Sequence, residues 1–329
     1  MVPAAQATAL ERLADAATLQ RPAPTRRMLV IVNPYATTMS VRLRRLVVYA
    51  LQGRFQVESV DTQRKGHAIE LCREAASEGY DVVVAFGGDG TVNEAANGLA
   101  GSDTVLTCLP GGATNVYCRM LGIPTDVVDA TEHLLTLADA WRPRRVDLAR
   151  VNERWFTFSA GAGLDASVVE RVDSHPRLKA RFGPWYYAQA AVATFIEKYA
   201  VRAPRFVASL HDGEVEGVSV FVQNSRPYTF FRRRPIDVAA DAGLGSGDLS
   251  GAVLTRANAV DLPTIAYRLL SRHASVARHR QVVGFEHLDG LRVRSVDDRP
   301  VPVQVDGDYI GEHDEAVFSV QRGGLRVLS

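Results

Sequence analysis

The chain has 329 residues, which is enough for two ordinary domains with buried cores. Apolar residues make up 47% and charged residues 23% of it, a composition typical of globular rather than disordered proteins. The formal net charge of +1 argues against bulk electrostatic binding, so nucleic acid is not an expected partner.

The sequence also indicates the cellular compartment in which the protein is expected. It has no uncharged apolar stretch of eighteen residues, which argues against a membrane span. Glu11, Arg12 and Asp15 lie where a signal peptide needs its apolar core. The three cysteines lack metal-ligand spacing and are typical of buried thiols in a reducing compartment. We expect a cytoplasmic protein, with peripheral contact at the inner membrane face left open.

The first half of the chain alternates short apolar runs with helical patterns. Residues 1–25 predict either one short amphipathic helix or a tail that ends at prolines. The predicted strands are residues 28–32, 55–60, 82–86 and 105–109, and the predicted helices are residues 41–51, 66–78 and 92–99. This alternation is typical of a doubly wound parallel sheet, so residues 26–146 are expected to form an α/β domain.

The pattern changes near residue 146. Short strand-like segments separated by turn residues follow, with helical stretches at residues 185–199 and 257–270. These segments predict a mainly antiparallel, β-sandwich-like domain over residues 147–329. The expected architecture is therefore an α/β domain followed by a β-rich domain.

A glycine-rich turn follows the third predicted strand. It consists of Gly87, Gly88, Asp89, Gly90 and Thr91, and a predicted helix follows it directly. Glycines let backbone N–H groups approach a ligand closely, and a helix N-terminus favours negative charge. Asp89 can face a phosphate-bound Mg²⁺, and the Thr91 hydroxyl can donate to a phosphate. A tight connection without a ligand is the alternative, but the context favours phosphate binding.

Several ordered motifs resemble those of the diacylglycerol kinase catalytic family, which includes bacterial lipid kinases and sphingosine kinases. The resemblance is carried by FGGDGTVNEAANGL, by LPGGATNVYCRMLGIP some twenty residues later, by Asn33-Pro34 and by Thr62 with Gly66-His67-Ala68. In the second half, residues 159–166 (SAGAGLDA) and residues 304–308 (QVDGD) are similar to two later family motifs. The resemblance runs from about residue 28 to the C-terminus.

The resemblance implies an ATP-dependent lipid kinase, a phosphotransferase of lipid metabolism with ATP in an interdomain cleft. It implies ATP and Mg²⁺ as cofactors and a lipid at the membrane surface as substrate, and it leaves homodimerisation open. The expected catalytic residues are Asp306 as general base, Asp308 in place of the usual Glu, and Asp89 through ATP-bound Mg²⁺. The expected nucleotide-binding residues are Asn33, Thr37, Thr38, Thr62, Gly87, Gly88, Gly90, Thr91, Glu94, Gly111, Gly112 and Asn115.

The residues around Asp306 also have a simpler interpretation. Asp-Gly is a strong hairpin signal, so Asp306-Gly307 predicts a tight turn on local grounds. A carboxylate on such a turn can still accept the proton of a lipid hydroxyl as phosphoryl transfer proceeds. Both interpretations can hold for one turn.

Three departures from the family pattern support a second hypothesis. Ala113 lacks a hydroxyl that would contact phosphate, and Val116 stands where the family often has Asp. Ser246 and Ser250 replace the carboxylates of a segment that holds a structural metal in some members, so we expect that metal to be lost. The alternative is therefore a nucleotide- or lipid-binding protein with reduced or lost turnover.

A third hypothesis is NAD kinase, which also carries GGDGT. That family follows the motif with a GNLGF-type segment, which is absent here. Aromatic residues beside arginines, at residues 228–234 and 177–187, suit a membrane interface. The same two segments also suit a solvated loop and a helix packed on a sheet.

Overall fold

The computed structural model describes residues 4–18, 26–36, 40–175, 178, 184–199, 205–211, 213–231, 234–239, 241–258, 260–271, 275–297 and 299–329. Internal contacts divide the chain into two units. Unit 1 consists of Met1–Val146 and Gly323–Ser329, and unit 2 of Asp147–Arg322. The last seven residues therefore lie with unit 1, whereas the predicted domain boundary assigns them to the second domain. Their partners explain this, because Leu328 N donates to Leu106 O and Gly101 N to Gly324 O.

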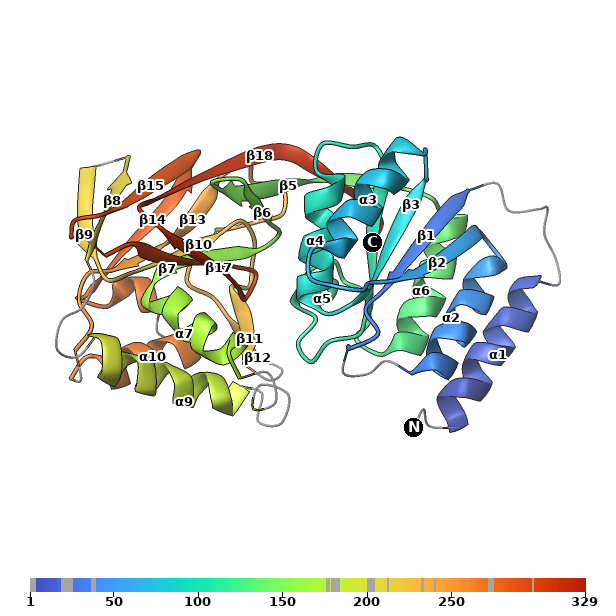
Figure 1. The fold of residues 1–329 in the computed structure, drawn as a ribbon, viewed down its shortest axis with the longest axis horizontal. Coiled ribbons are helices and arrows are strands. Elements are labelled where there is room, and N and C mark those ends of the chain that lie inside the picture. Colours follow the sequence, from blue (N-terminus) through green and yellow to red (C-terminus); the bar gives the residue numbers. More distant parts are fainter. Residues whose placement is uncertain are drawn as a thin grey trace. The chain divides into compact units, whose positions relative to one another are not determined.

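Unit 1 is built on a parallel sheet (Figure 1). Its strands run in the order β2 (Gln56–Asp61), β1 (Arg27–Val32), β3 (Val82–Gly87) and β4 (Val105–Pro110). Near its C-terminus β18 (Glu315–Val327) pairs in parallel with β4, through Val327 and Leu106. Strands β3 and β4 are buried along their whole length, as expected for continuous apolar runs in a sheet covered on both faces.

Helices cover both faces of this sheet (Figure 1). They are α1 (Ala4–Thr18), α2 (Val41–Gln52), α3 (His67–Ser77), α4 (Asp89–Leu99), α5 (Val116–Met120) and α6 (Val127–Asp139). The pair α3 and α4 covers one face, and α2 packs with α6 on the other. The N-terminal segment is helical and packs on α2 and α6, with Ala7 and Leu10 buried, so the helical alternative for it is correct.

Unit 2 contains a six-stranded antiparallel sheet. Its order is β14 (Val282–Leu288), β13 (Leu249–Leu254), β10 (Ser219–Gln223), β7 (Ser159–Gly163), β16 (Val301–Val305) and β17 (Asp308–His313). A second set of strands comprises β5 (Arg144–Val151), β6 (Arg154–Phe156), β8 (Phe206–Leu210), β9 (Gly213–Gly217), β15 (Gly290–Ser295) and most of β18. A separate hairpin joins β11 (Thr229–Phe231) to β12 (Arg234–Ile236). The expected α/β and antiparallel β architecture is confirmed.

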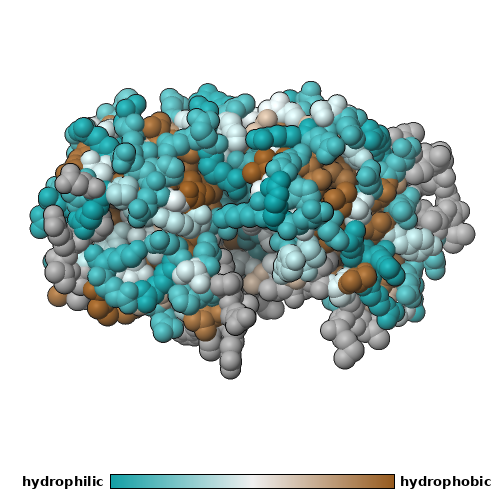
Figure 2. Space-filling view, in the orientation of Figure 1, coloured by the Kyte–Doolittle hydropathy of each residue, from teal (hydrophilic) through white to brown (hydrophobic). Residues whose placement is uncertain are grey.

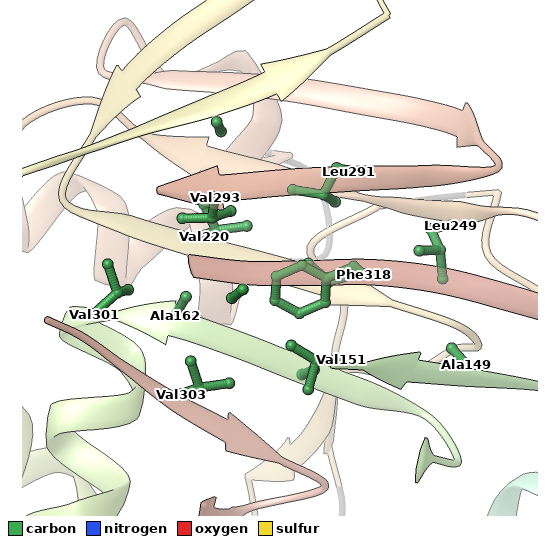
Figure 3. Close-up of a cluster of buried hydrophobic side chains, with 14 of the residues drawn as sticks. Ala149, Val151, Ala162, Val220, Leu249, Leu291, Val293, Val301, Val303 and Phe318 are labelled. Atoms are coloured by element: carbon green, nitrogen blue, oxygen red, sulfur yellow. The ribbon is translucent and has the colours of Figure 1, made fainter. Parts of the chain in front are cut away.

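The main core of unit 2 lies between these two sets of strands. Figure 3 shows its side chains, with Val220 and Val303 from the six-stranded sheet and Val293 and Phe318 from the other strands. A second cluster joins the six-stranded sheet to a helical layer. That layer comprises α7 (Leu164–Asp173), α9 (Pro184–Thr194), the π-helix η1 (Phe195–Tyr199), α10 (Leu262–Leu270) and the 3₁₀-helix η2 (Val276–Arg278).

The structure differs from the predicted elements at a few boundaries. Helix α10 begins at Leu262 rather than at residue 257, with Pro263 in its first turn, where proline is tolerated. Helices α5, α6 and α7 and strands β14 and β17 are not among the predicted elements. Among the residues that the structure describes, no helix is long and apolar enough to cross a membrane.

Candidate functional site

Two glycine-rich loops of unit 1 lie against each other. Strands β3 and β4 are neighbours in parallel register, with Gly87 opposite Pro110, so the loops that follow them emerge at one edge of the sheet. Gly111 N donates to Gly87 O at 2.9 Å. A Cβ on Gly111 would lie 2.9 Å from Gly87 Cα, and one on Gly112 would lie 2.8 Å from Gly88 Cα. The approach of the two backbones therefore requires glycine at residues 111 and 112 whether or not a ligand binds.

The N-terminus of α4 opens into this double loop. Its N-cap, Gly88, is extended and provides no side-chain cap. Asp89 Oδ1 accepts a hydrogen bond from Tyr117 N at 3.1 Å, which ties α4 to the start of α5. Asn33, at the end of β1, donates from Nδ2 to Thr91 Oγ1 at 3.3 Å. The structure thus brings Asn33, Asp89 and Thr91 to the loop edge, beside the N-terminus of α4.

Two other predicted site residues are engaged in shaping the fold. Asn115 has a φ of 49° and forms a closed ring with Gly112, accepting from Gly112 N and donating to Gly112 O. Glu94 accepts from Gly66 N at 2.7 Å and from Ala68 N at 3.2 Å, so its carboxylate caps α3. Asn115 thus supports the second glycine loop, and Glu94 supports the start of α3.

The other predicted nucleotide-binding residues to be located in unit 1 are Thr62, Gly90, Thr37 and Thr38. Thr62 follows β2, and its backbone N donates to Val32 O. Gly90 lies in the first turn of α4. Thr37 and Thr38 lie outside the described residues.

Cys108 and Cys118 flank the second glycine loop. Their sulfur atoms lie 3.0 Å apart in a thiol hydrogen bond, and both residues are buried. That hydrogen bond, together with burial, raises the pKa of Cys108 well above its usual range. Cys108 is therefore a protonated packing residue, and the burial of both cysteines agrees with the expectation of buried thiols.

Asp306 of unit 2 lies in a tight hairpin turn between β16 and β17. Val305 pairs with Asp308, and the two central residues, Asp306 and Gly307, have φ values of 49° and 82°. Positive φ at both positions is the signature of a type I′ turn, which confirms the hairpin interpretation. Asp308 begins β17 and is partly exposed.

The Asp306 carboxylate receives four hydrogen bonds. Its Oδ2 accepts from Thr157 N at 2.7 Å and from the Thr157 hydroxyl at 2.8 Å. Its Oδ1 accepts from Phe158 N at 3.0 Å and from Ser159 N at 3.1 Å. Such donors hold the carboxylate in one orientation. Asp306 is also buried, with 6% of its surface exposed.

A cluster of polar side chains around a second carboxylate, that of Asp165, adjoins this turn. Asp165 Oδ2 accepts from the Tyr228 hydroxyl at 2.6 Å and from Gln304 Nε2 at 2.8 Å. Gln304 Oε1 in turn accepts from Gly307 N at 3.0 Å. A Cβ on Gly161 would lie 2.0 Å from Asp165 Oδ2, so a side chain at residue 161 would displace this carboxylate. The cluster thus connects the start of α7 with the Asp306 turn.

Asp165 has no cation among the partners described above. Burial raises its pKa, and the two hydrogen bonds only partly oppose this. Burial and the nearby Asp165 also raise the pKa of Tyr228 well above its usual range. Asp165 lies in the sequence motif SAGAGLDA, but nothing in the sequence pairs it with Tyr228 and Gln304.

The segment expected to have lost a structural metal is held by protein groups. Gly247 N donates to Asp147 Oδ2 at 2.6 Å, and Arg322 Nε donates to Gly247 O at 3.2 Å. The carboxylate of Asp248 is in contact with His287 Nδ1 at 2.7 Å. Asp248 Oδ1 and Ser250 Oγ are buried without a hydrogen-bond partner. The expected loss of a structural metal from this segment stays a prediction.

Comparison with known proteins identifies the kind of domain. Residues 27–151, which contain both glycine loops, match the diacylglycerol kinase catalytic domain. This segment is a diacylglycerol kinase catalytic domain. The match makes residues 27–151 a kinase domain, a phosphotransferase, and implies the use of ATP.

The similarity to curated and solved proteins extends over most of the chain. The diacylglycerol kinases of Staphylococcus aureus strains bovine RF122 / ET3-1 and MRSA252 are each 25% identical over 309 residues, covering 90% of both chains. A solved diacylglycerol kinase structure from Bacillus anthracis str. Sterne has a TM-score of 0.69 at 22% identity. It covers 92% of this chain and 96% of its own, and it supports the two-part fold of α/β and antiparallel β elements.

Proposed function

We propose that this protein transfers the γ-phosphate of ATP to the hydroxyl of a diacylglycerol-like or long-chain-base lipid. The observation that carries the proposal is the double glycine loop of unit 1, with the uncapped N-terminus of α4 opening into it. Backbone N–H groups at such an edge suit the phosphates of ATP. The curated relatives, which are named diacylglycerol kinases, suggest the lipid class.

Asp89 is proposed to face the Mg²⁺ that accompanies ATP. Mg²⁺ typically takes one or two carboxylates, with phosphate oxygens and water completing its octahedral shell. The hydrogen bond from Tyr117 N fixes the Asp89 carboxylate at the loop edge, which suits one such ligand. When bound, the ion would neutralise charge that develops on the transferred phosphoryl group.

Asp306 is proposed as the general base. A base needs a lone pair directed at the substrate, and the described donors occupy two positions on each carboxylate oxygen. Three of these donors are backbone groups and fixed. The Thr157 hydroxyl is the exception, because its O–H can rotate away. We propose that the lipid hydroxyl replaces it at Oδ2 and passes its proton there.

Substitutions at these two positions test the assignment. Asp306→Asn should lower kcat by about 10²–10⁴-fold, the usual contribution of a general base, with ATP affinity unchanged. Thr157→Val keeps the shape, removes only the displaceable donor, and should retain activity. Thermal unfolding of each variant distinguishes lost chemistry from lost folding, since Asp306 also holds the backbone of residues 157–159.

The outcomes separate the competing hypotheses. If Asp306→Asn retains full activity, another group is the base. If the activity of Asp306→Asn falls only in proportion to its folded fraction, the role of Asp306 is structural: it holds the backbone of residues 157–159. Wild-type protein that binds ATP but transfers phosphate to no lipid would support the alternative of a binding protein, which Ala113 and Val116 motivate.

A further inference from the structure

Both central amides of the Asp306 turn have hydrogen-bond partners outside the turn. Asp306 N donates to Ser159 O at 2.7 Å, and Gly307 N donates to the side-chain Oε1 of Gln304 at 3.0 Å. The Asp306 carboxylate also accepts all four of its described hydrogen bonds from residues 157–159. The turn is therefore held by two parts of the chain, the segment 157–159 and the side chain of Gln304.

The Gln304 amide is itself held by two other side chains. Its Nε2 donates to Asp165 Oδ2 at 2.8 Å and to the Tyr228 hydroxyl at 2.9 Å. That hydroxyl donates to the same Asp165 oxygen at 2.6 Å, so the three side chains form a closed ring of hydrogen bonds. We call Asp165, Tyr228 and Gln304 the polar ring.

Two members of the polar ring are buried. Most of the surface in Figure 2 is hydrophilic, as expected where polar side chains face water. Gln304 and Tyr228 are exceptions, with 2% and 8% of their surface exposed. A buried polar group keeps its partners firmly, because little water is present to replace a lost hydrogen bond. The ring can therefore fix the orientation of the Gln304 amide.

The sequence leaves room for the polar ring at one glycine. Gln304 lies opposite Gly161 where β16 pairs with β7. A Cβ on Gly161 would lie 2.0 Å from Asp165 Oδ2 and 3.0 Å from Gln304 Nε2. The contact between strand β16 and the first turn of α7 is thus built over a residue without a side chain.

The contacts of Gln304 also explain why this residue is a glutamine. Gly307 N needs an acceptor, and the Asp165 carboxylate needs a donor. A primary amide offers both on one planar group, whereas an ionised carboxylate only accepts and an ammonium group only donates. An acidic or basic side chain of similar length would leave one of the two partners unsatisfied.

We propose that Gln304 is a positioning residue for Asp306, and that Asp165 and Tyr228 orient Gln304 for this role. Its amide fixes the residue that follows Asp306, and thereby the direction in which the Asp306 carboxylate faces the lipid hydroxyl. Small displacements matter here, because a shift of about 1 Å at a reacting group can cost about 10²-fold in rate. The inference rests on the proposed role of Asp306 as general base.

An exchange of acid and amide within the polar ring tests the proposal. Gln304→Glu keeps the acceptor for Gly307 N but sets a second carboxylate against that of Asp165. At pH 6 the two carboxylates can share one proton and keep the ring, and as pH rises to 9 they lose it and repel each other. The kcat of this variant relative to wild type should therefore fall with pH, by about 10–10²-fold, with the KM for ATP unchanged.

The double variant Asp165→Asn with Gln304→Glu restores one acid and one amide, with donor and acceptor exchanged. Its kcat should follow that of the wild type from pH 6 to pH 9. Two tyrosines near Asp165 keep their protons in this range, because burial raises the pKa of Tyr228 well above its usual value and that of Tyr199 to about 12. Asp306 is common to all the variants. A double variant no more active than Gln304→Glu would contradict the proposal.

Two further variants separate positioning from loss of folding. Gln304→Met keeps the length of the side chain without its polar atoms, and should lose kcat at every pH. Ser219→Ala removes the hydrogen bond from Asp165 N to Ser219 Oγ at 3.1 Å but leaves the polar ring whole, so it should keep the kcat of the wild type. Thermal unfolding shows that each variant is folded. Full activity in Gln304→Met, or an equal loss in Ser219→Ala, would overturn the proposal.

Hydrogen exchange at Gly307 separates this proposal from the proposed function. In protein whose glycines carry an NMR-active nitrogen isotope, the Gly307 amide is followed without lipid or turnover. It should exchange slowly in the wild type and at least about tenfold faster in Gln304→Met. Equal exchange in the two proteins rules out the positioning role, whether or not a lipid is phosphorylated. Slow exchange in a wild type that transfers no phosphate leaves the hold on the turn established and refutes the proposed function alone.

Discussion

At the scale of single residues, glycine at position 112 is fixed by the backbone of the neighbouring loop. A Cβ there would lie 2.8 Å from Gly88 Cα, a distance that forces a backbone to move. The reverse substitution is milder, because a Cβ on Gly88 would lie 3.4 Å from Gly112 Cα. We expect Gly112→Ala to cost about 1–3 kcal/mol in the free energy of unfolding, and Gly88→Ala clearly less. Urea unfolding of both variants measures this, and equal losses would contradict the packing described.

Asp165 gives a second prediction, in the pH dependence of stability. Burial raises the pKa of Asp165 in the folded protein, whereas the pKa of an aspartate in an unfolded chain is about 3.9. Between the two pKa values the folded state binds more protons, so its stability falls as pH rises through that window and then stays lower. Asp165→Asn removes this effect and can still accept both hydrogen bonds.

Thermal unfolding of wild type and Asp165→Asn from pH 4 to pH 8 makes the comparison. The variant should gain stability relative to wild type as pH rises, with the gain levelling off above the folded pKa. A constant difference across the range would mean that Asp165 titrates as an ordinary exposed aspartate.

Residue roles were only partly predictable from the sequence. The glycine loops have a local pattern, so Gly87–Thr91 and residues 110–115 could be found in a single pass. The partners of Asp165 lie 63 and 139 residues away in the chain, and no local signal links them. The capping of α3 by Glu94 is likewise a contact across 28 residues.

At the scale of elements, we predict that the turn around Gly247 keeps its structure without a bound metal ion. Asp147, His287 and Arg322 provide its polar partners. A chelator should therefore leave the Tm of the purified protein unchanged. Arg322→Ala should lower stability by about 0.5–1.5 kcal/mol, the typical net value of one hydrogen bond. A Tm that falls on chelation and recovers with Mg²⁺ or Ca²⁺ would show that a cation is held after all.

The accuracy of the predicted elements follows their burial. Strands β1, β3 and β4 are buried on both faces and therefore appear in the sequence as continuous apolar runs. Their positions can for this reason be predicted accurately. Strand β14 alternates exposed and buried residues irregularly around a bulge, and it is not predicted. Helix α5 has only five residues, too few for a helical period to be visible.

At the scale of the whole molecule, each unit carries a different part of the proposed chemistry. Unit 1 has the glycine loops and Asp89, and unit 2 has Asp306 and the Asp165 cluster. The return of residues 323–329 to unit 1 connects the chain's end with β4, which composition alone does not indicate. Substrate choice depends on side chains that are distant from one another in the sequence. The class of lipid therefore could not be predicted from the sequence.

The central claim is tested most directly by following the γ-phosphate itself. The wild-type protein is incubated with γ-labelled ATP and Mg²⁺ in mixed micelles that contain diacylglycerol, monoacylglycerol, ceramide or a long-chain base. The account predicts label in an extractable lipid phosphate for at least one of these lipids, with loss of most of it in Asp89→Ala. Intact ATP binding with no labelled lipid from any of them would contradict it.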